Sequence, residues 1–85
     1  MQAQSPAEAL PELYRAILDS VAELERLGER REAGRVREEA SRIYSRSWDE
    51  PARRELDAIL RRADRTATRR DTGRQRGLRR GTAAG

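Results

Sequence analysis

The apolar residues of this 85-residue chain fall into three groups, and within each group they recur at intervals of three and four residues. That spacing is typical of amphipathic α-helices, because it places the apolar side chains along one side of the helix. The first group is Leu10, Leu13, Tyr14, Ile17, Val21, Leu24 and Leu27, widened by Leu18 and Ala22. The inner face of the second group is Ala33, Val36, Ala40, Ile43, Tyr44 and Ser47, and the third group is Ala52, Leu56, Ile59, Leu60 and Ala63. The pattern predicts three helices, over about residues 11–27, 31–47 and 50–68.

Residues that start or stop helices mark the ends of these segments. Residues 5–8 have the form of a capping box, with a proline at the first helical position. Because Pro11 should kink or restart a helix, we expect firm helix from about residue 11 and a flexible N-terminus over residues 1–9. Gly28 can adopt the left-handed conformation that ends a helix, and Asp49 suits the N-cap of the third helix.

The three helices predict an all-α fold, in which a helical hairpin and a covering third helix form a three-helix bundle over residues 10–68. Ala33 and Ala40 suggest that the first two helices approach each other closely, because a bulky side chain would clash there. The core is small, since only 35% of the residues are apolar. Either the bundle is stable by a few kcal/mol, or a partner or second copy completes it.

The positive charge is concentrated at the C-terminus. All 19 basic residues are arginine, which is typical of a GC-rich coding sequence of the actinobacterial type. Residues 1–68 carry 13 arginines against 14 acids, whereas residues 69–85 carry six arginines against one acid and several glycines. The apolar period also stops there, so the composition predicts a disordered basic tail over residues 69–85.

The tail arginines are candidates for contact with nucleic acid. Arginine side chains bind phosphates in a salt-dependent manner that does not depend on base sequence. The candidates are Arg69, Arg70, Arg74, Arg76, Arg79 and Arg80, and Arg61, Arg62 and Arg65 could extend them onto the third helix. The alternative interpretation is a solvated tail that has no ligand and keeps a small protein in solution.

The residue types argue against an enzyme. With no histidine, cysteine or lysine in the chain, imidazole, thiolate and Schiff-base chemistry are excluded. Ser41 and Ser45 have no base to activate them and are expected on the solvent side of their helix. The neighbouring acids Glu38 and Glu39 diverge by about 100° on a helix and do not converge on one cation. We therefore expect no catalytic residue, no metal and no cofactor.

The sequence also predicts a cytoplasmic location without membrane insertion. The chain contains no apolar run long enough to span a bilayer. Its first nine residues, MQAQSPAEA, lack the basic and apolar regions of a secretory signal.

Two aromatic residues are candidates for a protein interface. Tyr14 and Trp48 either cap the core or, where they are exposed, anchor an interface with another protein. The sequence leaves both interpretations open.

The hairpin resembles one repeat of the tetratricopeptide type. Residues 27–44, LGERREAGRVREEASRIY, carry a glycine at the turn (Gly28) and small residues early and late in the second helix (Ala33 and Ala40). The chain is also similar to three-helix microtubule-interacting-and-transport domains, whose third helix carries a motif that residues 60–65 match loosely. Both families bind peptide segments, so the resemblance implies an interaction module.

Taken together, the sequence predicts a small non-catalytic module that binds an unknown protein or a second copy of itself. The alternative is an accessory nucleic-acid-binding protein that acts through its arginine-rich tail.

Overall fold

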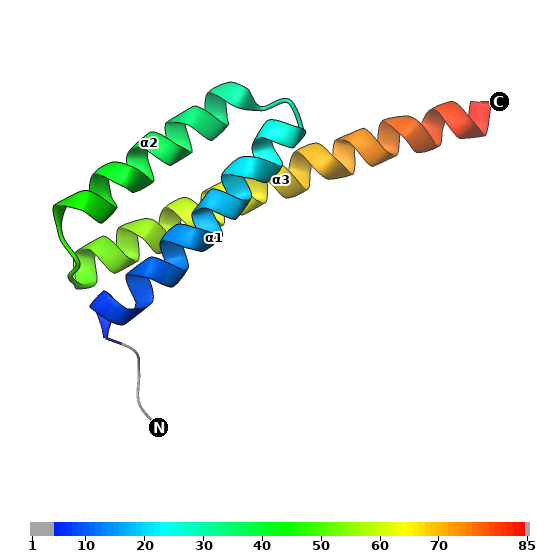
Figure 1. Cartoon of the computed structure of the whole chain (residues 1–85). Helices are drawn as coiled ribbons and strands as arrows, with labels where there is room; N and C mark the ends of the chain where they lie inside the picture. The colour runs from blue at the N-terminus through cyan, green and yellow to red at the C-terminus, as the bar shows by residue number, and fades with distance from the viewer. Residues whose placement is uncertain (1–4, 85) are drawn as a thin grey trace.

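The chain folds as three helices joined by short links. The computed structural model describes the backbone of residues 5–84 and the side chains of residues 5–73. The helices are α1 (Pro6–Arg26), α2 (Arg30–Arg46) and α3 (Glu50–Ala84). The first two form an antiparallel hairpin, and α3 packs along it in the direction of α1 and projects past the α1–α2 turn (Figure 1). The predicted all-α, three-helix bundle is confirmed.

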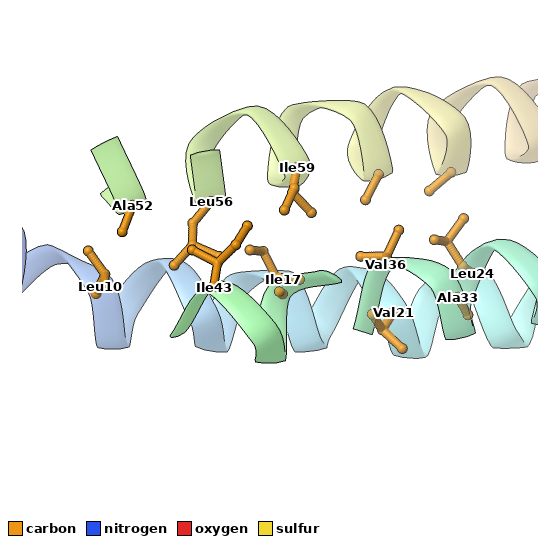
Figure 2. Close-up of a cluster of buried hydrophobic side chains, with 13 residues drawn as sticks. Leu10, Ile17, Val21, Leu24, Ala33, Val36, Ile43, Ala52, Leu56 and Ile59 are labelled. Carbon is orange, nitrogen blue, oxygen red and sulfur yellow. The ribbon is translucent and has the colours of Figure 1, made fainter. Parts of the chain in front are cut away.

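The core is built from the three apolar groups found in the sequence. Figure 2 shows apolar side chains of α3, among them Leu56 and Ile59, pointing toward those of α1 and α2. Two of the four buried residues of α2 are alanines, whose short side chains permit a close approach to a neighbouring helix. The buried apolar set is Leu10, Ile17, Val21, Leu24, Ala33, Val36, Ala40, Ile43, Ala52, Leu56, Ile59, Ala63 and Ala67. Ala22, which the pattern assigned to the first stripe, is exposed.

α1 begins earlier than the sequence predicted. The Ser5 Oγ accepts a hydrogen bond from the Glu8 backbone N–H at 3.3 Å, and the Ser5 N–H donates to Glu8 Oε1 at 3.2 Å. This capping box starts the helix at Pro6, so the prediction that residues 5–9 are flexible is wrong, while residues 1–4 lie outside the described part. Pro11 is tolerated because the carbonyl that loses its partner belongs to Ala7, in an exposed first turn where water can bind it.

The turn between α1 and α2 depends on Gly28. This residue has a φ of 85°, in the left-handed region predicted for it. Its N–H donates to the Glu25 carbonyl at 3.0 Å, and the Glu29 N–H donates to the Leu24 carbonyl at 2.8 Å. These two bonds form a Schellman motif, which satisfies the last carbonyls of α1 and reverses the chain.

α3 starts as predicted and ends later. The Asp49 Oδ1 accepts a hydrogen bond from the Ala52 N–H at 3.0 Å and so caps the helix. At the other end, α3 continues past the predicted end at residue 68, and Arg70 there forms an ion pair with Glu29 at 2.5 Å. The predicted disordered tail is therefore wrong for residues 69–73. For residues 74–85, whose side chains lie outside the described part, disorder stays a prediction.

Candidate interaction surface

Three aromatic rings from two helices and a link lie against one another on the surface of the hairpin. Tyr14 comes from α1, Tyr44 from α2, and Trp48 from the link between α2 and α3. The Tyr14 and Tyr44 rings are stacked, with centroids 4.3 Å apart and planes inclined by 1°. The Tyr44 and Trp48 rings have centroids 4.9 Å apart and are inclined by 30°. We call these three residues the aromatic stack.

Hydrogen bonds hold the two ends of the aromatic stack. The Tyr14 hydroxyl lies 2.9 Å from the Ser41 Oγ, and the Trp48 Nε1 donates to the Tyr44 carbonyl oxygen at 2.6 Å. Each outer ring is therefore fixed both by stacking and by a polar contact. The prediction that Ser41 faces solvent is wrong, because it is half-buried beneath this contact, whereas Ser45 is exposed as predicted.

The exposure of the rings answers the question that the sequence left open. Tyr14 and Tyr44 are partly buried and pack against the core. Trp48 is 45% exposed and is the one large apolar side chain classed as exposed among residues 5–73. Tyr14 thus contributes to core packing, while Trp48 presents apolar surface to solvent. Tyr44, which was expected on the inner face of its helix, packs against the core and is also the middle ring of the stack.

Of the six arginines predicted to contact nucleic acid, the structure describes the side chains of Arg69 and Arg70. Arg70 is engaged with Glu29, at the start of α2. Arg69 is exposed. The side chains of Arg74, Arg76, Arg79 and Arg80 lie outside the described part of the chain.

Charged side chains line the seam between α2 and α3. Arg62 pairs with Glu39 at 2.5 Å, and Arg46 pairs with Glu55 at 3.2 Å. The shallow groove along this seam is lined by these four residues and by neighbours such as Arg42. Such partly exposed ion pairs contribute little to stability. In this groove they engage the carboxylates of Glu39 and Glu55.

Glu50 and Arg53 form an ion pair that shifts the pKa of both groups. The guanidinium of Arg53 hydrogen-bonds to Glu50 and lowers the pKa of that carboxyl, and the same contact raises the pKa of Arg53. The pair is exposed in the first turn of α3, where a carboxylate also favours the helix dipole. Among the side chains that the structure describes, no three metal-binding residues gather at one point. Within the same residues, no helix has the length and apolar character needed to cross a membrane.

Comparison with known proteins adds no family to these observations. No protein-family model, no curated protein and no solved structure was found that matches the chain. The resemblance to tetratricopeptide-type and transport-type hairpins therefore stays a prediction.

Proposed function

We propose that this chain is a small non-catalytic interaction module that binds a protein partner through the aromatic stack. The observation that carries the proposal is Trp48, whose ring is both exposed and held in place. The other large apolar side chains of residues 5–73 are buried or partly buried, so the exposed tryptophan is the natural anchor for a partner.

The energetics of binding support an anchor of this kind. Tryptophan and tyrosine dominate the residues whose truncation weakens protein interfaces, often by about 2 kcal/mol or more. The Trp48 side chain also loses little conformational entropy when a partner covers it, because stacking on Tyr44 already restricts the ring. The partner is another protein or a second copy of this chain, and the small core is compatible with both.

The test is affinity capture from native lysate with the full chain and with Trp48→Ala. We expect the wild type to retain a partner at low and at high salt, because the contact is apolar, and Trp48→Ala to lose most of it. Trp48→Phe is the matched control, since it keeps an aromatic ring on Tyr44 and should retain the partner. Sedimentation of the purified chain over a range of concentrations separates a second copy from a different protein.

Two outcomes would count against this function. If Trp48→Ala and the wild type capture equal amounts of the partner, and circular dichroism shows that both are folded, the aromatic stack is not part of the interface. Capture that disappears at high salt for all variants would place the contact on charged residues instead.

A further inference from the structure

We propose that the partner of the aromatic stack is an amphipathic helix, which lies along the seam between α1 and α2 and places a carboxylate against Arg37. This inference rests on the proposed function, since Trp48 stays the anchor, and it adds the chemistry of the partner. The surface consists of two rows of residues, which we call the outer rows. The α1 row is Ala7, Pro11, Tyr14, Leu18 and Ala22, and the α2 row is Gly34, Arg37, Ser41 and Ser45, continued by Trp48 in the link.

The α1 row is a second apolar stripe beside the one that forms the core. Its members recur at intervals of three and four residues, so they lie along one side of the helix. None of them belongs to the buried residues of α1; Tyr14 and Leu18 are half-buried and the other three are exposed. The row rises by about 22 Å, or about four helical turns. A partner helix of about the same length fits along it.

The outer rows face away from α3. On α1, Leu18 precedes Ser20 by two positions, and Ser20 donates a hydrogen bond to α3 at 2.5 Å. On α2, Ser41 follows Glu39 by two positions, and Glu39 forms an ion pair with α3 at 2.5 Å. Two positions along a helix correspond to a rotation of about 200°. The third helix therefore covers the other side of the hairpin and leaves the outer rows uncovered.

The two rows meet at the seam and form one surface. The Tyr14 ring of the α1 row stacks on Tyr44, and its hydroxyl lies 2.9 Å from the Ser41 Oγ of the α2 row. The α2 row consists mostly of small residues, and a Cβ added at Gly34 meets nothing within 4 Å. Short side chains permit a close approach of another helix, and Trp48 at the end of the row supplies a large apolar contact.

Arg37 is the one charged residue of the outer rows. It is exposed and forms no ion pair or hydrogen bond among the side chains of residues 5–73. Beside the rows, Arg15 on α1 and Glu38 on α2 carry opposite charges, so Arg37 decides the charge of the surface. A partner that covers Arg37 removes water from the guanidinium, which costs free energy unless an acid takes the place of the water. A carboxylate is the matching group, because it accepts two hydrogen bonds from one guanidinium.

The same charge favours a different protein over a second copy of the chain. The outer rows contain no aspartate or glutamate. Two copies that faced each other through these rows would bring together two Arg37 side chains with no carboxylate between the rows, and like charges repel. We therefore expect the purified chain to stay monomeric.

The probe is a displayed library of tryptophan-free peptides about four helical turns long. The peptides carry leucines at intervals of three and four residues, with glutamate, glutamine or lysine beside the leucines. The full chain is immobilised, and the retained peptides are sequenced. We expect the wild type to retain peptides with glutamate beside the leucines in excess over lysine. The affinity of a retained peptide follows from the fluorescence of Trp48, which is the single tryptophan of the chain.

A charge reversal tests the role of Arg37. Arg37→Glu should change the preference from glutamate to lysine and weaken the binding of a wild-type glutamate peptide by about tenfold or more, because like charges then face each other. The matched control is Arg65→Glu, which makes the same charge change at an exposed position of α3 and should keep the preference for glutamate. Trp48→Ala should lose most peptides whatever their charge. Circular dichroism checks that each variant is folded.

The outcomes separate this inference from the proposed function. If Arg37→Glu and the wild type show the same preference, or if the wild type shows none, the acidic helix is wrong, while loss of the peptides in Trp48→Ala would still support the anchor. Equal retention by Trp48→Ala and the wild type would overturn both. A library from which the wild type retains no peptide would overturn the helical partner, and a dimer of the purified chain that Trp48→Ala abolishes would assign the outer rows to a second copy instead.

Discussion

Leu56→Ala is expected to lower the free energy of unfolding by about 2–5 kcal/mol, which is enough to leave much of the chain unfolded at physiological temperature. Leu56 is completely buried and projects from α3 into the cluster formed with α1 and α2 (Figure 2). Truncation removes the transfer free energy of three carbons and leaves a cavity among side chains that cannot fill it. In a bundle with so few large apolar residues, no other part of the core compensates.

The measurement is urea unfolding followed by helical circular dichroism. Leu56→Met is the matched control, because it keeps nearly the same volume and should cost less than about 1.5 kcal/mol. A loss below 1 kcal/mol for Leu56→Ala would mean that α3 does not cover the hairpin as described.

Ala40→Leu is expected to lower the free energy of unfolding by about 1–3 kcal/mol through overpacking. Ala40 is fully buried on α2, whose inner face is made of small and β-branched residues. Three added carbons have no free volume to enter, so α2 must move away from its neighbours.

The control for Ala40→Leu is Ala22→Leu, at an exposed position of α1 where the added carbons face solvent. Its effect on urea unfolding should lie within about 0.5 kcal/mol of zero. A neutral Ala40→Leu would place that residue on the surface and contradict the register of the hairpin.

The three helices could be predicted because each carries its own apolar period. The start of α1 was missed because Pro11 outweighed the capping box in the sequence argument. In the structure the two signals are compatible, since the carbonyl that Pro11 leaves unpaired belongs to an exposed residue, Ala7.

The end of α3 could not be predicted from local pattern. The ion pair between Arg70 and Glu29 joins residues far apart in sequence, so no local period reveals it. This tertiary contact lies beyond residue 68, where the composition of the chain favours an earlier end of the helix.

The candidate site was predicted in part. Trp48 and Tyr14 were named as possible anchors, but their contact through Tyr44 was not anticipated. The interval of four residues between Tyr44 and Trp48 is a signal that could have indicated it. The exposure of Trp48, by contrast, depends on the backbone of residues 47–49, where α2 has ended and α3 has not begun.

The measurement that tests the central claim most directly is the fluorescence of Trp48 in the purified full chain, where it is the single tryptophan. The account predicts a red-shifted emission and quenching by acrylamide at low protein concentration, because nearly half of the side chain meets solvent. Addition of the captured partner should shift the emission to the blue and protect the ring. A blue-shifted, unquenched emission from the isolated monomer would contradict the account, because Trp48 would then be a core residue and not an anchor.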